Sequence, residues 1–213
     1  MGEHLIVPVE RDIVAPTGKI VGVVRNFRAP DDGRHVSPTR GIGGGGFGGM
    51  RLTGKWKVCK YADEATHLAM MSGDPEALPY EVVLSQNTLL NTGINEFWNI
   101  LAGVSGHPVF SNANSSIGIG NSSTAFSASQ TGLQASSGSS NQFTQACDSG
   151  YPSISSQTIT FQTTVGASNA LFTWNEMIVV NSSSSIALDR VVQNQGTKSG
   201  SNVWTAQVAV TAS

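Results

Sequence analysis

Apolar and polar residues alternate with a period of two through the second half of the chain. TITFQTTV (residues 158–165) and VWTAQVAV (residues 203–210) each place apolar or small residues at every second position. Side chains of a β-strand point alternately to opposite faces, so each segment has one face suited to a core. Serine- and asparagine-rich breaks separate these segments from other short apolar runs. The pattern predicts a mainly β protein, with an antiparallel β-sandwich or jelly-roll-like domain.

One segment has the period of a helix instead. In NTLLNTGINEFWNILA (residues 87–102), apolar residues recur at i, i+4, i+7, i+8 and i+11, namely Leu90, Ile94, Phe97, Trp98 and Leu101. Asn87 or Thr88 could cap the start of such a helix, and Gly103 could follow its end. We therefore expect one amphipathic helix over residues 87–102, with its apolar face packed on the core.

The composition of the chain changes near residue 54. In residues 1–54, short β-branched runs are broken by Pro8 and Pro16, and the glycine-rich segment GIGGGGFGGM follows at residues 41–50. Such a segment has too few apolar groups to build its own core. It is predicted to be an extended Gly/Pro-rich N-terminal arm that becomes ordered against a neighbouring subunit, with a flexible linker as the alternative. Residues 55–213 then form the β-sandwich domain.

Formal charge is concentrated in the first hundred residues. Beyond residue 100 the charged side chains are Asp148, Glu176, Asp189, Arg190 and Lys198. The net charge of −2 argues against a strongly basic nucleic-acid-binding domain. No apolar run approaches the roughly 20 residues of a membrane helix, and the start of the chain predicts no secretory signal. We therefore expect neither nucleic acid nor a membrane as a partner.

Two glycine-containing segments raise the question of a phosphate-binding loop. Gly118 and Gly120 lack the third glycine of a dinucleotide fingerprint, and no lysine follows them before Lys198. Residues 41–50 lack the flanking strand and helix that a phosphate loop requires. Both segments are predicted to be structural, with residues 117–120 as a short strand, and we expect no cofactor.

The remaining candidates for chemistry are isolated side chains. Four histidines occur without the spacing of a zinc site, namely His4, His35, His67 and His107. Cys59 and Cys147 are expected to be free buried thiols, although one disulfide is the alternative. Asp148, near Tyr151, suits a turn cap, and Glu176 has no second carboxylate for a glycosidase pair. We predict no catalytic, cofactor-binding or metal-binding residues, and no enzyme.

Four segments together resemble a widespread set of tailed-bacteriophage virion proteins. They are NTLLNTGINEFWNILAG, FSNANSSIGIGNSSTAFSASQTGLQA, DSGYPSISSQTITFQTTVGASNALFTWNEMIVVN and LDRVVQNQGTKSGSNVWTAQVAVTAS. The resemblance covers roughly residues 52–213 and leaves the arm largely unmatched. It implies a structural, non-enzymatic virion component that is assembled in the cytoplasm of a bacterial host.

The resulting expectation is a homo-oligomeric protein that decorates or stabilises the capsid or tail. Its partners would be other virion proteins, such as the major capsid or tail proteins, contacted through the N-terminal arm and the β-sandwich. The alternative is a fibre-like host-recognition module that binds cell-surface carbohydrate through exposed Trp or Tyr rings.

Overall fold

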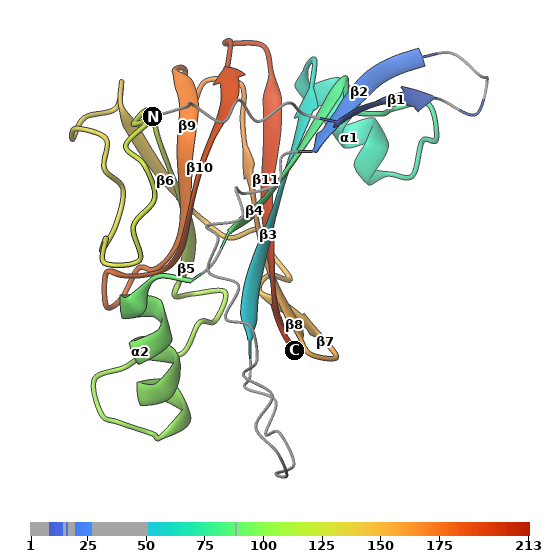
Figure 1. The fold of residues 1–213 in the computed structure, drawn as a ribbon. Coiled ribbons are helices and arrows are strands. Elements are labelled where there is room, and N and C mark those ends of the chain that lie inside the picture. The colour runs from blue at the N-terminus through green and yellow to red at the C-terminus, as the bar shows by residue number, and fades with distance from the viewer. Residues whose placement is uncertain (1–8, 15, 17–19, 27–50, 88) are drawn as a thin grey trace, which may run out of the picture.

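The described part of the chain folds as two packed β-sheets with two short helices at their margins (Figure 1). The computed structural model describes residues 9–14, 16, 20–26, 51–87 and 89–213. Within these residues eleven strands divide into a seven-stranded sheet, sheet A, and a four-stranded sheet, sheet B. The mainly β, sandwich-like fold that the alternating pattern predicted is confirmed.

Sheet A is built around the C-terminal strand. Its order is β1 (Val9–Val14), β2 (Ile20–Asn26), β4 (Glu81–Asn87), β3 (Leu52–Tyr61), β11 (Val203–Ala212), β8 (Thr158–Val165) and β7 (Ser153–Ser155). Its neighbouring strands are antiparallel except for the parallel pair β2 and β4. Because β11 pairs with both β3 and β8, the last strand joins the two halves of the chain.

Sheet B is antiparallel throughout. Its order is β10 (Ile186–Thr197), β9 (Thr173–Asn181), β5 (Ser115–Gly120) and β6 (Gln142–Ala146). Residues 121–141, which we call the β5–β6 loop, pack Phe126 and Leu133 against a buried cluster that includes Ile178 of β9. Met177 and Val179, on the other face of β9, belong to the main core. The β5–β6 loop therefore covers the face of sheet B that points away from sheet A.

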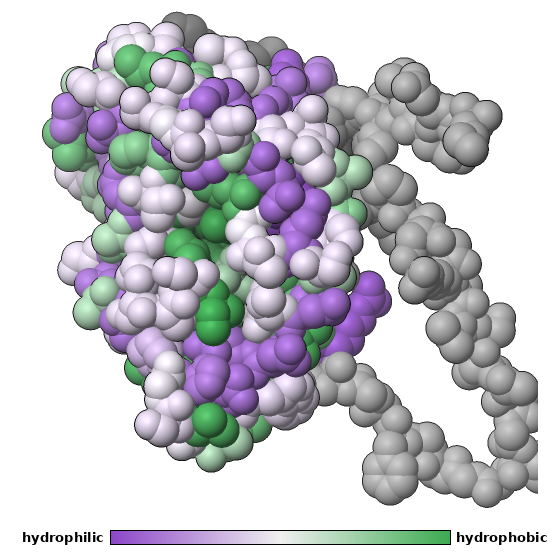
Figure 2. Space-filling model, turned by 90° about the vertical axis from the view of Figure 1, so that its left-hand side faces the viewer, coloured by the Kyte–Doolittle hydropathy of each residue, from purple (hydrophilic) through white to green (hydrophobic). Residues whose placement is uncertain are grey.

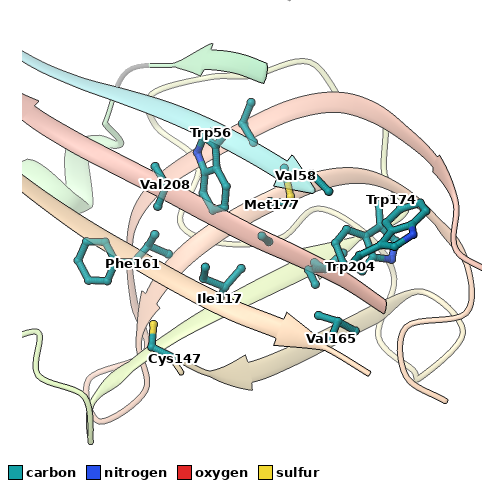
Figure 3. Packing of buried hydrophobic residues seen from close by; sticks show 14 of the residues in the cluster. Trp56, Val58, Ile117, Cys147, Phe161, Val165, Trp174, Met177, Trp204 and Val208 are labelled. Carbon is teal, nitrogen blue, oxygen red and sulfur yellow. The ribbon is translucent and has the colours of Figure 1, made fainter. Parts of the chain in front are cut away.

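The main core lies between the two sheets and is rich in tryptophan (Figure 3). Trp56, Trp174 and Trp204 are at most 1% exposed. The rings of Trp174 and Trp204 meet edge to face, with centroids 4.8 Å apart, so they join sheet B to sheet A. The faces predicted for residues 158–165 and 203–210 supply further core residues, including Phe161, Val165, Ala206 and Val208.

Part of the predicted arm belongs to sheet A. β1 and β2 extend this sheet beyond β4, and the backbone N–H of Val23 donates to the carbonyl of Tyr80 at 3.0 Å. Arg25 also lies 2.6 Å from Glu81 of β4. These two strands therefore add to a sheet of their own chain. The glycine-rich segment at residues 41–50, together with His4 and His35, lies outside the described residues.

The described residues contain two helices where the sequence analysis expected one. They are α1 (Glu64–Met71) and α2 (Asn91–Leu101). The expected helix over residues 87–102 thus begins later, since Asn87 still pairs with Gly54 as the last residue of β4. Leu90 is the N-cap, in place of the predicted Asn87 or Thr88, and Thr88 lies outside the described residues. Gly103 follows the helix with φ +67°, as expected.

The predicted orientation of α2 is wrong for the second half of the helix. Leu90 is buried and Ile94 packs against the core, but Phe97, Trp98 and Leu101 are 36%, 49% and 68% exposed. The fully buried positions of the helix are Gly93 and Glu96. Hydrophobic periodicity shows which face of a helix is apolar, but not whether the same chain covers it.

Gly93 explains why the helix docks by its less apolar side. A Cβ atom at this position would lie 2.2 Å from the carbonyl oxygen of Leu188, so the helix backbone rests directly on β10. The N–H of Leu90 donates to the same carbonyl at 3.1 Å. The hydroxyl of Thr92 donates to the backbone carbonyl of Ala187, also at 3.1 Å. These contacts fix the rotation of α2 and leave Phe97, Trp98 and Leu101 outside.

Replacement of Gly93 by alanine tests this docking. Within a helix, Gly→Ala ordinarily stabilises by up to about 1 kcal/mol. Here the added methyl group meets backbone that cannot rotate away, so we expect Gly93→Ala to lower the free energy of unfolding by about 1–3 kcal/mol. Urea denaturation measures the difference.

Gly132→Ala is the matched control, because no atom lies within 4 Å of the Cβ position there. Its free energy of unfolding should stay within about 0.5 kcal/mol of the parent protein. A stabilised Gly93→Ala variant would show that α2 does not rest on β10.

Candidate functional site

The Gly-x-Gly segment is part of a sheet and makes room for side chains of the next strand. All six residues of β5 are buried, which confirms the predicted strand. A Cβ atom at Gly118 would lie 2.9 Å from Ile178, and one at Gly120 would lie 2.4 Å from the Oε1 atom of Glu176. Each of these glycines is paired with the residue it accommodates, since Gly118 faces Ile178 and Gly120 faces Glu176 across the β5–β9 ladder. The two glycines therefore have a packing role in sheet B.

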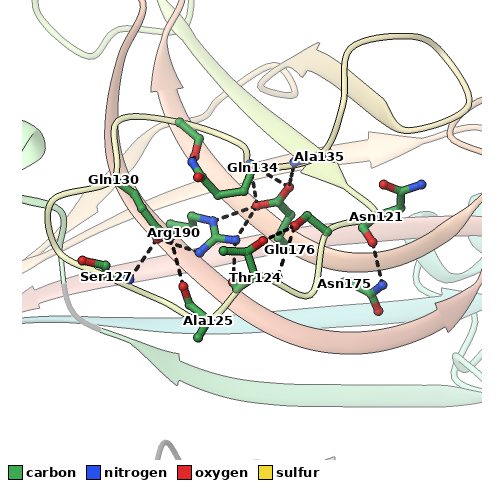
Figure 4. A network of polar contacts seen from close by, with 12 residues as sticks. Asn121, Thr124, Ala125, Ser127, Gln130, Gln134, Ala135, Asn175, Glu176 and Arg190 are labelled. Carbon is green, nitrogen blue, oxygen red and sulfur yellow. Dashed lines mark hydrogen bonds and ion pairs between the residues drawn. The ribbon is translucent and has the colours of Figure 1, made fainter.

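Glu176 has a partner that the sequence did not reveal. It forms an ion pair with Arg190 of β10 at 2.7 Å, and both side chains are fully buried (Figure 4). The guanidinium group also donates to the side-chain oxygen of Gln130 at 2.7 Å and to the carbonyl of Thr124 at 3.0 Å. The ion pair is thus joined to two points of the β5–β6 loop.

The carboxylate of Glu176 holds a third point of the same loop. It accepts hydrogen bonds from the backbone N–H groups of Gln134, at 2.9 and 3.0 Å, and of Ala135, at 2.7 Å. A buried ion pair is tolerated when further hydrogen bonds satisfy its remaining groups. Every contact described here runs to the protein itself, so the arrangement anchors the loop to sheet B.

Asp189 precedes Arg190 on β10 and points to the opposite face, into the space between the sheets. Its Oδ2 atom accepts a hydrogen bond from the indole N–H of Trp56 at 2.9 Å. Gly54 leaves room for this carboxyl group, because a Cβ atom there would lie 2.4 Å from Oδ2. Burial raises the pKa of Asp189 to about 7, and the hydrogen bond from Trp56 opposes part of that rise.

The two remaining charged residues after residue 100, Lys198 and Asp148, also form hydrogen bonds within the protein. Lys198 is 1% exposed and donates to the carbonyls of Gly166 and Ala167 at 2.7 and 3.2 Å. Burial lowers its pKa to about 8. Asp148 is half-buried and accepts hydrogen bonds from the N–H and hydroxyl of Thr164 at 2.9 and 2.8 Å. Of the five charged side chains after residue 100, four are buried and Asp148 is half-buried, so the surface of this half carries little charge.

The two cysteines and His67 are each placed by packing, whereas the ring nitrogen Nδ1 of His107 lies 2.6 Å from the carboxylate of Glu96. Cys59 and Cys147 are buried and free, as expected, and burial raises the pKa of Cys147 to about 11. His67 of α1 meets the ring of Tyr61 at 5.0 Å. Within the described ranges, no group of three or more His, Cys, Asp or Glu side chains could hold a metal ion. Neither α1 nor α2 is long and apolar enough to cross a membrane.

The first candidate site is an exposed apolar surface on α2. We call it the α2 surface and define it by Phe97, Trp98, Leu101 and Val104, which are between 36% and 68% exposed. The rings of Phe97 and Trp98 touch edge to face, with centroids 5.2 Å apart. Figure 2 views the molecule from the side of sheet B, where hydrophobic residues reach the surface in its lower part.

The second candidate site is a groove of about 510 Å³ on the outer face of sheet A. Strands β3, β11 and β8 provide its floor. His67, Met70 and Met71 of α1 line one side, and the turn at residues 148–151 lines the other. In that turn the N–H of Tyr151 donates to the carbonyl of Asp148 at 3.0 Å, which agrees with the turn expected there.

Ionisation of Asp189 predicts a pH-dependent stability. The folded state holds this proton up to pH 7, whereas the unfolded chain loses it near pH 4. The contribution of Asp189 to the free energy of unfolding therefore falls as pH rises from 4 to 7, and is constant above. Asp189→Asn cannot ionise, so its stability relative to the parent should increase between pH 5 and pH 8 in urea titrations. If the free energies of unfolding of the two proteins changed in parallel with pH, the raised pKa of Asp189 would be contradicted.

Loss of the Glu176 charge should destabilise the protein more than loss of both charges. Glu176→Gln leaves Arg190 buried without its counter-charge, which typically costs about 3–5 kcal/mol. Adding Arg190→Met removes that charge, so the double variant should recover part of the loss. Urea denaturation gives both values, and amide exchange at Gln134 and Ala135 should quicken in the single variant. Strictly additive effects would mean that the two side chains do not act as a pair.

Comparison of the chain with protein-family models, with curated proteins and with solved structures gave no significant match. The resemblance of four segments to tailed-phage virion proteins therefore stays a prediction. Function must be inferred from the two surfaces that the fold presents, namely the α2 surface and the groove on sheet A.

Proposed function

We propose that the protein is a structural component of a tailed-phage virion, where it decorates or stabilises the capsid or tail. The observation that carries this proposal is the uncharged α2 surface, at which two aromatic and two aliphatic side chains are exposed together. Contiguous exposed apolar groups of this kind mark sites of protein association. The resemblance to virion proteins suggests a phage particle as the place where the protein acts. The α2 surface is the part of the protein that would contact a neighbouring subunit there.

A second copy of the same chain is the partner that this surface fits. Residues 91–112 contain only two ionisable side chains, Glu96 and His107. Glu96 is buried, and its Oε2 atom lies 2.6 Å from the ring nitrogen Nδ1 of His107. Two copies can therefore meet at α2 without repulsion between like charges. An antiparallel arrangement of the two helices would also oppose their dipoles favourably.

The anchored loops support such an assembly role. The β5–β6 loop is fastened to sheet B by the Glu176–Arg190 pair, and residues 166–167 are fastened by Lys198. Loops held in this way lose little further conformational freedom when a neighbour binds to them. Repetition of the contact over many copies would convert a weak pairwise association into firm attachment.

Labelling of intact particles tests the virion assignment. An antibody against the purified protein should mark phage particles from cultures that carry the gene, at regular positions on the head or tail in electron micrographs. Mass spectrometry of the same purified particles should find the protein in many copies. Its absence from the particles would reject the virion assignment, whatever the behaviour of the α2 surface.

The double variant Trp98→Ser/Leu101→Ser tests the role of the α2 surface. We expect the parent protein to form oligomers in analytical ultracentrifugation and the variant to sediment as a monomer, with an unchanged melting temperature. Trp98 is the one exposed residue among four tryptophans, so its fluorescence should shift to the blue on association.

Leu68→Ser is the matched control. Leu68 lies on α1 and is 58% exposed, so the change removes a similar apolar group elsewhere. This variant should associate as the parent protein does. A parent protein that stays monomeric at high concentration would reject self-association, but would leave the presence of the protein in virions to be decided by labelling.

A further inference from the structure

The groove on sheet A has a polar floor whose arrangement follows from strand register. Thr205 of β11 stands between Cys59 of β3 and Thr164 of β8. The next row along the same face places Gln207 between Lys57 and Gln162. Both rows line the groove. The floor thus carries hydroxyl and carboxamide groups at the regular spacing of neighbouring strands.

The carboxamide row is held in place by a chain of hydrogen bonds. Gln207 donates to Gln162 at 2.8 Å, and Gln162 donates to Asp148 at 3.1 Å. Asp148 also receives the two hydrogen bonds from Thr164, so its carboxylate is largely occupied within the protein. Side chains fixed in this way are pre-organised to bind a ligand without a large loss of freedom.

Thr205 is the member of the floor that lacks a partner. Its hydroxyl oxygen is buried and makes no hydrogen bond in the described structure, and the residue is 8% exposed. The neighbouring hydroxyl of Thr164 is already used by Asp148. A buried polar group without a partner destabilises the protein. In the described conformation this oxygen has almost no accessible surface, so rotation of the Thr205 side chain about its Cα–Cβ bond is needed to turn it to the groove. A ligand there that offers a hydroxyl or amide group would then satisfy it.

The walls of the groove add apolar surface to this polar floor. Met70 and Met71 of α1 and the rings of Tyr61 and Tyr151 line it. The groove has one cationic side chain, Lys57, and one anionic side chain, Asp148, in addition to the histidine. A ligand of strong charge of either sign would therefore meet a like charge. The lining suits a neutral molecule with hydroxyl groups and apolar faces.

We infer that this groove binds a neutral saccharide of one or two rings. Sugar hydroxyls both donate and accept hydrogen bonds, as the Gln207 amide and the Thr205 hydroxyl require, and C–H faces of the ring pack on methionine and tyrosine. The volume of about 510 Å³ lies within the range of small-molecule sites. A peptide cannot add here as a strand, because β3 and β11 are each paired on both sides. Beside the groove, the outer backbone groups of β8 are bonded to Asp148, whose N–H donates to the carbonyl of Gln162 and whose carboxylate accepts from the N–H of Thr164. The inference is independent of the virion assignment.

A glycan array and ligand-observed NMR with methyl glycosides of glucose, galactose, mannose and N-acetylglucosamine provide the binding test. At least one neutral sugar should bind the full-length protein and raise its melting temperature. Thr205→Val should weaken this binding at least tenfold while leaving the melting temperature equal or higher, because it removes an unpaired hydroxyl. If Thr205 had only a structural role, Thr205→Val would instead lower the melting temperature and leave the sugar affinity unchanged.

Two further variants complete the test. Met71→Glu alters a 63% exposed wall residue, so the fold should be unaffected while sugar affinity falls at least tenfold. Thr160→Val, on the same face of β8 but outside the groove, should keep full affinity. The inference is overturned if no neutral sugar on the array binds, or if both Thr205→Val and Met71→Glu retain the parent affinity.

Discussion

The buried contact between Arg190 and Glu176 is the interaction on which the outer half of the sandwich depends. It joins β10 to β9, and its hydrogen bonds reach three points of the β5–β6 loop. The preceding residue, Asp189, turns to the other side of the same strand and meets Trp56 of sheet A. Two consecutive residues of β10 therefore hold a loop on one face of sheet B and the opposite sheet on the other.

The strand content of the fold could be predicted because it depends on local alternation. Residues 158–165 and 203–210 bury the face that their pattern indicated, since each β-strand sorts its own side chains. The orientation of α2 could not be predicted in this way. It is decided by the contact of Gly93 with Leu188, two residues far apart in the sequence. Likewise, nothing local to Glu176 indicates that Arg190 neutralises it, because β9 and β10 must pair first.

The two candidate surfaces lie on different sheets and differ in character. The α2 surface is carried by a helix that packs on β10 of sheet B, whereas the groove crosses β3, β11 and β8 of sheet A. One is apolar and suits a protein neighbour, and the other combines amide and hydroxyl groups with methionine and tyrosine. Because neither uses residues of the other, a molecule attached to a neighbour through α2 would still present its groove to solvent.

The burial of every charged side chain after residue 100, in full or in part, has a consequence for the conditions under which the protein works. At 0.1 M salt, dissolved ions screen the interactions of exposed charges that lie more than about 10 Å apart, and they screen buried charge pairs much less. Contacts made by this half of the molecule should therefore depend less on charge screening by salt than contacts between exposed charged side chains do.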